Sequence, residues 1–267
     1  MKKLVVGNLE LDMGRPKVAV PLTGKTHEEI IEQCKKLLDL PCDIIEWRVD
    51  FFLDNIEDLE RKLAIDEVHA EVIRILDDID YITGSMPVIF TVRSKSQGGR
   101  CTLNKEQVYD LNSLAAQSQL VKFVDVELFD DHNKVVRDVI VGHVDDIHSF
   151  GCKVIMSFHD FKSMPKSEEI LNIVDVMRSF GADIAKVVAF AHNKKDAVNM
   201  IKCSNTLTQG DKDPVILIGM GKNGLLTRII GGQYGSAITF ASLEETTAHG
   251  QMDVKTVHRL LDEYYTA

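Results

Sequence analysis

Eight short apolar runs recur along the chain and alternate with longer amphipathic segments. The runs are rich in Val, Ile, Phe and Thr and are apolar almost throughout, which is typical of strands in a parallel sheet covered on both faces. The predicted strands are residues 17–22, 43–49, 88–93, 123–128, 153–158, 183–190, 215–218 and 237–240.

The segments between these runs have the features of helices. Thr26 is a suitable N-cap, and Glu28 and Glu29 behind it suit the partial positive charge of a helix start. Ile30, Cys34, Leu37 and their neighbours then recur at helical spacing. The other predicted helices are residues 56–78, 105–118, 133–149, 167–179, 194–207, 225–231 and 253–264.

A strand followed by a helix, repeated eight times, predicts an α/β protein with a single (β/α)8 TIM barrel. An open doubly wound sheet is the alternative. No long Pro/Gly/Ser linker divides the chain, so residues 1–267 are interpreted as one catalytic domain. Residues 1–16 lie outside the repeat and predict a short N-terminal β-hairpin that plugs the barrel's N-terminal mouth.

Composition narrows the class of protein. The hydrophobic fraction of 45% and the charged fraction of 27% are ordinary for a globular enzyme. A net charge of −10 disfavours a sequence-independent nucleic-acid binder. The five cysteines lack zinc-like spacing, so no metal site is expected. Without a long apolar run or a signal-peptide core, a cytoplasmic protein with no membrane contact is expected.

Ionisable residues interrupt six successive predicted strands near their C-terminal ends, where barrel enzymes place their chemistry. They are Glu46, Arg48 and Asp50, Arg93, Asp125 and Glu127, His159 and Asp160, Lys186, and Arg228 in the helix after the seventh strand. An acidic protein can still bind an anion where cationic side chains gather locally. These residues therefore predict a site for a small anionic molecule.

Lys186 is the most informative of these residues. If it points inward from its apolar strand, burial favours the neutral amine, which can attack a carbonyl to form an imine. The alternative is a lysine that faces outward or pairs with Glu127 or Asp183.

His159 lies one strand earlier and can shuttle a proton near neutral pH, although a structural histidine is the alternative. Arg48, Arg93 and Arg228 could hold a carboxylate or phosphate, or some of them could pair internally with neighbouring carboxylates.

Together these segments resemble the type I 3-dehydroquinate dehydratases. The matching stretches are residues 46–50, 90–94 with Gly98 and Gly99, 125–129, 157–161, Lys186, Arg228, 235–237 and 250–251. The resemblance covers essentially the whole chain in order. It implies a (β/α)8-barrel hydro-lyase of the shikimate pathway of aromatic amino acid biosynthesis, without a metal or dissociable cofactor, that forms a homodimer.

The resemblance also implies a role for each matching residue. Lys186 would form the imine with the C3 ketone of 3-dehydroquinate, and His159 would be the general acid and base for syn loss of water. Arg228 and Gln251 would hold the substrate carboxylate. Glu46, Arg48 and Arg93 would surround the ring hydroxyls, and Thr247 would keep the hydroxyl of the lid-like loop.

Four positions depart from the family pattern. Gln97 matches a glutamate next to the catalytic histidine, Phe158 an asparagine, Ala185 a proline, and His249 a proline of the loop. A neutral amide at position 97 can orient His159 but supports it electrostatically far less, so slower turnover is expected. Two alternatives remain: a paralogue that binds a related cyclic polyol carboxylate without efficient turnover, and a class I aldolase-like barrel acting on a phosphosugar.

Overall fold

The computed structural model describes residues 1–84, 86–129, 135, 137–244 and 246–266. All eight predicted strands are present and form one parallel sheet in the order β10-β3-β4-β5-β6-β7-β8-β9. Their bounds are β3 Lys17–Leu22, β4 Ile44–Arg48, β5 Val88–Thr91, β6 Phe123–Glu127, β7 Lys153–Asp160, β8 Ile184–Phe190, β9 Val215–Met220 and β10 Ile238–Phe240.

The sheet curls until its two ends meet. Val215 of β9 forms a parallel bridge with Ser236, and the Ala237 amide donates to the Val215 carbonyl at 2.9 Å. The predicted (β/α)8 barrel is therefore confirmed, and the open doubly wound sheet is wrong. The predicted strand bounds agree to within two residues.

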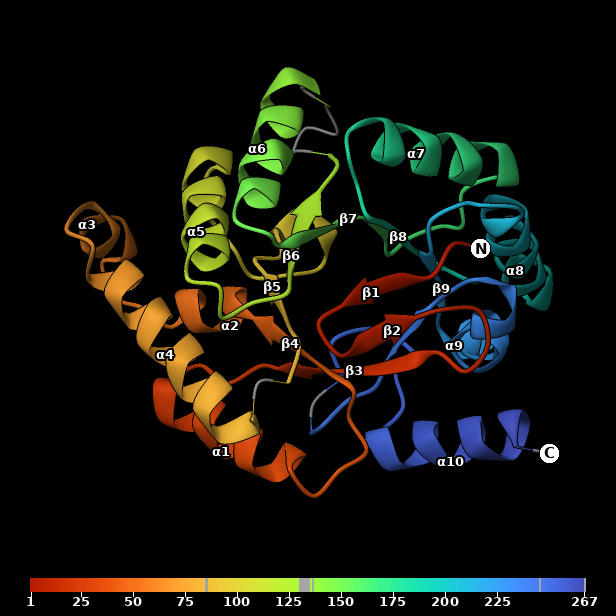
Figure 1. The fold of residues 1–267 in the computed structure, drawn as a ribbon, viewed down its shortest axis with the longest axis horizontal. Helices are drawn as coiled ribbons and strands as arrows, with labels where there is room; N and C mark the ends of the chain where they lie inside the picture. The colour runs from red at the N-terminus through yellow and green to blue at the C-terminus, as the bar shows by residue number, and fades with distance from the viewer. Residues whose placement is uncertain (85, 130–134, 136, 245, 267) are drawn as a thin grey trace.

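Helices surround the strands, as Figure 1 shows. They are α1 His27–Leu37, α2 Val49–Asp54, α3 Leu59–Ala64, α4 Glu67–Thr83, α5 Lys105–Gln117, α6 Arg137–Ser149, α7 Ser167–Ser179, α8 Lys194–Thr208, α9 Leu225–Ile230 and α10 Val254–Tyr265. Thr26 caps α1 as predicted, because its side chain accepts from the Glu29 amide. In the described part of the chain, none of these helices could span a membrane.

The helices differ from the prediction in three places, and the first is α2, which the sequence did not predict. The predicted helix over residues 56–78 is in fact two helices, α3 and α4, because Asp66 between them adopts a left-handed conformation with φ 57°. The predicted helix 133–149 begins, within the described residues, at Arg137; residues 133, 134 and 136 lie outside them.

The predicted N-terminal hairpin is confirmed, and it covers the N-terminal mouth of the barrel. Strands β1 (Leu4–Val6) and β2 (Leu9–Leu11) pair antiparallel. Figure 1 shows this hairpin lying across the middle of the strands. Its side chains Val6, Leu9 and Leu11 join the apolar cluster inside the barrel, which includes Ile44 and Phe123 near the strand starts.

Above this apolar layer, the alternation of side chains along each strand places polar groups inside the barrel. Two residues beyond Ile44, Ile89, Phe123, Ile155 and Ile184 come Glu46, Thr91, Asp125, Ser157 and Lys186. All five of these polar residues are buried. The barrel interior is thus apolar at its N-terminal end and ionic toward its C-terminal end, where a site can form.

Candidate active site

The nine residues to which the family resemblance assigns a role line one cavity at the C-terminal end of the strands. The cavity encloses about 470 Å³, including its open mouth, and is lined by Glu46, Arg48, Arg93, Gln97, His159, Lys186, Arg228, Thr247 and Gln251, with six further residues. Five of the nine lie on strands β4, β5, β7 and β8 or within two residues of their ends. The barrel therefore brings together residues that are up to 205 positions apart in the sequence (251 − 46).

Lys186 points into this cavity and lies between two carboxylates. Its Nζ is 3.3 Å from Glu46 Oε1 and 3.3 Å from Asp125 Oδ2. The Phe240 ring covers the ammonium, with Nζ 4.3 Å from the ring centroid. The expected inward orientation is confirmed, and the partners are Glu46 and Asp125 rather than Glu127 or Asp183. Two carboxylates so close to Nζ can accept the proton that the amine must lose before it attacks a carbonyl.

Gln97 fixes the orientation of His159. Gln97 Oε1 accepts a hydrogen bond from the His159 backbone amide at 2.9 Å and lies 3.2 Å from the ring Nδ1. The backbone N–H of His159 can only donate, so the Gln97 atom that faces it is the oxygen Oε1. This oxygen can only accept, so Nδ1 of the imidazole must carry the proton of the second hydrogen bond. The lone pair of the neutral imidazole is then on Nε2.

The surroundings of His159 favour its neutral form. Burial keeps the pKa of His159 well below its ordinary value, and the nearby cations Arg93, Lys186 and Arg48 lower it further. A neutral imidazole with a free Nε2 can accept a proton from a bound substrate. Gln97, being uncharged, does nothing to offset the three cations.

Two of the three arginines are neutralised within the protein. Arg48 forms a two-pronged ion pair with Asp50, with Nε and Nη2 each 2.8 Å from a carboxylate oxygen. Arg93 donates to Asp125 at 2.8 Å and to Glu127 at 2.9 Å. Burial alone would lower the pKa of Arg93, but these carboxylates raise it above its ordinary value. For these two arginines the internal-pairing alternative is correct, although both still line the cavity.

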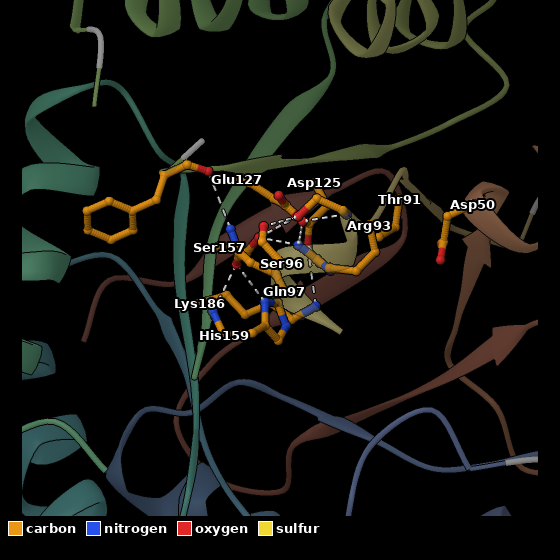
Figure 2. A network of polar contacts seen from close by, with 12 residues as sticks. Asp50, Thr91, Arg93, Ser96, Gln97, Asp125, Glu127, Ser157, His159 and Lys186 are labelled. Carbon is orange, nitrogen blue, oxygen red and sulfur yellow. Dashed lines mark hydrogen bonds and ion pairs between the residues drawn. The ribbon is translucent and has the colours of Figure 1, made fainter. Parts of the chain in front are cut away.

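Figure 2 shows the resulting network around Arg93. Ser157 Oγ accepts from Arg93 Nη1 at 2.8 Å and donates to Asp125 Oδ1 at 2.6 Å. Asp125 therefore binds Arg93, Ser157 and Lys186 at once. Burial would raise the pKa of Asp125, but Arg93 and Lys186 hold it below its ordinary value. This network fixes the position from which Lys186 reaches the cavity.

Arg228, in the last turn of the short helix α9, differs from these two arginines. Its side chain is 2% exposed, and Nη1 donates a hydrogen bond to the Phe240 carbonyl at 3.3 Å. Nε and Nη2 are buried without a hydrogen-bond partner among the described residues. Burial lowers the pKa of Arg228 to about 10. A buried guanidinium with two unused donor groups is suited to a bound anion.

The loop after β10 covers one side of the cavity. Gln251 Nε2 donates to the Ala241 carbonyl at 3.0 Å, and Gln251 Oε1 accepts from the Thr247 amide at 2.7 Å and from its hydroxyl at 3.1 Å. His249 stacks edge-on against Phe190, with ring centroids 5.9 Å apart. The loop is thus held to the barrel, with Thr247 and Gln251 against the cavity.

Three buried residues of the site escaped the sequence analysis. Thr91 donates to Glu46 at 3.2 Å, Ser157 links Arg93 to Asp125, and Phe240 covers Lys186. Strand alternation would have placed Thr91 and Ser157 on the inner face, in line with Glu46 and Lys186. No group of three or more potential metal ligands is present in the part of the chain that the structure describes.

Known proteins resemble the chain over nearly its full length. The profile of the type I 3-dehydroquinase family matches residues 18–267. The 3-dehydroquinate dehydratases of Listeria welshimeri and Klebsiella pneumoniae are 34% and 36% identical to it, over 98% and 97% of both chains respectively.

Solved structures agree with these relatives. The type I 3-dehydroquinate dehydratase of Clostridium difficile, crystallised with covalently modified comenic acid, is 33% identical with a TM-score of 0.87, covering 100% of this chain and 99% of that one. The 3-dehydroquinate dehydratase of Geobacillus kaustophilus is 26% identical, also with a TM-score of 0.87, covering 100% and 98%. The chain belongs to the type I 3-dehydroquinase family.

Proposed function

We propose that the protein dehydrates 3-dehydroquinate to 3-dehydroshikimate in the shikimate pathway, through an imine on Lys186 with His159 as general acid and base. The observation that carries this proposal is the shared cavity: a buried amine, a neutral imidazole and a guanidinium without a carboxylate partner line the same space. Family membership and the names of the full-length relatives support the same reaction.

3-Dehydroquinate is a cyclic polyol carboxylate, and its negative charge would determine how it is oriented in the cavity. Its carboxylate would bind Arg228, whose Nε and Nη2 have no other hydrogen-bond partner among the described residues. Gln251 would add its second amide hydrogen, since the first is used by Ala241. Glu46, Arg48, Arg93 and Thr247 would surround the ring hydroxyls. The C3 ketone then faces Lys186.

Imine formation is the first chemical step. The neutral Lys186 amine adds to the C3 ketone, a carbon–nitrogen double bond forms, and the ketone oxygen leaves as water. Glu46 and Asp125, each 3.3 Å from Nζ, are the carboxylates closest to the amine protons. The protonated imine withdraws electrons from C2 and makes its hydrogen acidic, so no metal ion or organic cofactor is needed.

Proton transfer by His159 completes the reaction. Nε2 takes the C2 proton, the electron pair moves onto the imine nitrogen as an enamine, and the returning pair expels the C1 hydroxyl. The same Nε2 gives its proton to that hydroxyl, which leaves as water from the same face. Hydrolysis of the imine then releases 3-dehydroshikimate and restores the Lys186 amine. Gln97 holds the imidazole for both transfers but cannot stabilise the imidazolium as a carboxylate would.

The assay is direct because the product is a conjugated enone that absorbs in the ultraviolet. We expect absorbance to rise when the purified protein meets 3-dehydroquinate, and the rise to disappear in Lys186→Ala. Lys222→Ala, an exposed lysine outside the cavity, is the matched control and should keep the activity. Ligand-dependent stabilisation without product would favour a binding protein instead. Turnover of a phosphosugar but not of 3-dehydroquinate would favour an aldolase.

A further inference from the structure

A second cavity lies between helix α5 and strands β5 and β6, and we refer to it as the α5 cavity. It encloses about 510 Å³ including its mouth, comparable with the active site. Lys105, Val108, Tyr109 and Asn112 line it from the helix, and Glu127 lines it from the barrel. None of the four helix residues lines the active-site cavity.

Two polar atoms in the wall of this cavity, one on Asn112 and one on Tyr109, lack hydrogen-bond partners among the described residues. Asn112 is 1% exposed, and its Nδ2 lies 3.3 Å from His143 Nε2. Its Oδ1 is buried with no partner among the described residues, and the same holds for the Tyr109 hydroxyl. Leaving a buried polar group without a hydrogen bond destabilises the folded protein. Such groups in the wall of a cavity are expected to bind something that enters it.

The wall is rigid where these groups lie. The Tyr109 ring stacks on the His143 ring, with centroids 3.9 Å apart and an interplanar angle of 11°. Burial raises the pKa of Tyr109 above its ordinary value, so the phenol remains a hydrogen-bond donor at physiological pH. The hydroxyl and the Asn112 amide are therefore held in place before any ligand arrives.

The charges and apolar groups of the cavity specify the chemistry of the ligand. The Lys105 ammonium and the Tyr109 hydroxyl can both bind a carboxylate. The Glu127 carboxylate and Asn112 Oδ1 can both accept from an ammonium group. Leu103 and Val108 offer an apolar surface beside them. A molecule with an ammonium, a carboxylate and an apolar side chain satisfies all three features.

We propose that the α5 cavity binds a small α-amino acid with an apolar side chain. Its carboxylate contacts Lys105 and Tyr109, its ammonium contacts Glu127 and Asn112, and its side chain packs on Leu103 and Val108. This site is separate from the one proposed for 3-dehydroquinate.

The α5 cavity shares two residues with the ion-pair network of the active site, Asp125 and Glu127. Glu127 Oε1 accepts from Arg93 Nη1 at 2.9 Å and from the Ser94 amide at 3.0 Å. An ammonium bound at Glu127 competes with Arg93 for this carboxylate. Arg93 then has more positive charge to offer an anionic substrate, so the bound amino acid lowers the KM for 3-dehydroquinate. By linkage, the substrate strengthens amino acid binding by the same factor.

Calorimetric titration with L-leucine tests the proposal, with L-aspartate as the comparison. We expect saturable binding of L-leucine to one site and no binding of L-aspartate. Because the titration needs no turnover, it can also be run on Lys186→Ala, which separates its failure from a failure of the proposed reaction.

Two variants locate the binding. Tyr109→Phe keeps the stacked ring and should weaken L-leucine binding about fivefold, the size of one ordinary hydrogen bond. Val108→Phe should abolish it by filling the cavity, and Tyr81→Phe, an 87% exposed tyrosine, should leave it unchanged. Absence of binding by any apolar amino acid would mean that the cavity holds water only. Binding that survives both cavity variants would overturn the location, and an unchanged KM would overturn the coupling.

Discussion

At the scale of single residues, the three arginines of the active site differ in how their charge is balanced. Arg48 and Arg93 are held by Asp50, Asp125 and Glu127, whereas Arg228 has no carboxylate within salt-bridge distance among the described residues. A buried unpaired guanidinium costs folding free energy. We interpret this cost as the reason that Arg228 binds a substrate carboxylate strongly, since the ligand supplies the missing partner.

Arg228→Met should therefore weaken substrate binding without lowering the stability of the protein. We expect the KM for 3-dehydroquinate to rise about tenfold to a hundredfold, the value of a hydrogen-bonded charge pair of about 1.5–3 kcal/mol. The unliganded variant should unfold at the same urea concentration as the parent or a higher one, because an unpaired buried charge has gone. Arg74→Met, an exposed arginine of α4, is the control. A less stable variant with an unchanged KM would contradict this role.

Gln97→Glu tests the electrostatic support of His159. A carboxylate beside Nδ1 stabilises the imidazolium and raises the pKa of His159, which burial, Arg93, Lys186 and Arg48 now lower. We expect kcat to rise by roughly tenfold to a hundredfold, the usual effect of changing the residue that hydrogen-bonds to a functional histidine. Because the neutral imidazole is the base, activity falls as pH drops through this pKa, so the acid limb of kcat/KM should move to higher pH.

Gln97→Leu provides the opposite comparison. It removes the acceptor that both His159 N–H groups use, so the ring is no longer oriented and the rate should fall. A Gln97→Glu protein that is folded but no faster than the parent would show that position 97 does not limit turnover.

At the scale of elements, helices α5 and α6 meet around a buried histidine. His143 of α6 stacks on Tyr109 of α5, and burial lowers the pKa of His143 to about 4. In the unfolded chain this pKa is about 6.5. At pH values between these two pKa values, the unfolded state therefore binds a proton that the folded state does not. The contribution of His143 to the free energy of unfolding is thus fully present above about pH 6.5 and is lost as the pH falls toward 4.

His143→Phe should remove this pH dependence while keeping the stacked ring. The pKa difference corresponds to a loss of about 3 kcal/mol in the free energy of unfolding for the parent at acid pH. Urea midpoints at pH 7 and pH 4.5 measure it for both proteins. We expect the parent to lose more stability between the two pH values than the variant. Equal losses would mean that His143 is protonated in the folded state.

The sequence predicted the elements of the barrel well because each strand is nearly continuous in apolar character. The features that the sequence did not predict have local physical causes. The break between α3 and α4 depends on a left-handed Asp66, which the apolar periodicity of residues 56–78 does not reveal. The pairing of Arg93 with Asp125 and Glu127 depends on strand register, which composition leaves open.

At the scale of the whole molecule, chemistry and stability lie at opposite ends of the barrel. Ion pairs surround the C-terminal mouth, and the hairpin side chains Val6, Leu9 and Leu11 close the apolar N-terminal end. All nine predicted site residues share one cavity because a closed barrel leaves a single place where the strand ends converge. The unpaired state of Arg228 could not be predicted, since it depends on which carboxylates the fold places near the other arginines.

Leu11→Ala tests whether stability and catalysis depend on opposite ends of the barrel. Leu11 is fully buried, so truncation should cost about 2–5 kcal/mol of unfolding free energy. The kcat measured on the folded protein should remain unchanged, because the active site is at the other end of the barrel. Val5→Ala, at a hairpin position that is 54% exposed, should alter neither quantity. A large loss of kcat in Leu11→Ala would show that the two ends are coupled.

Chemical trapping of the imine on Lys186 would identify the intermediate of the proposed reaction itself. Borohydride added during turnover of 3-dehydroquinate would reduce the imine to a stable amine, which mass spectrometry of the digested protein can locate. We predict one substrate-derived adduct, on the peptide containing Lys186, together with loss of activity, and no adduct in Lys186→Ala. Full activity after borohydride treatment, or an adduct on another lysine, would contradict the mechanism.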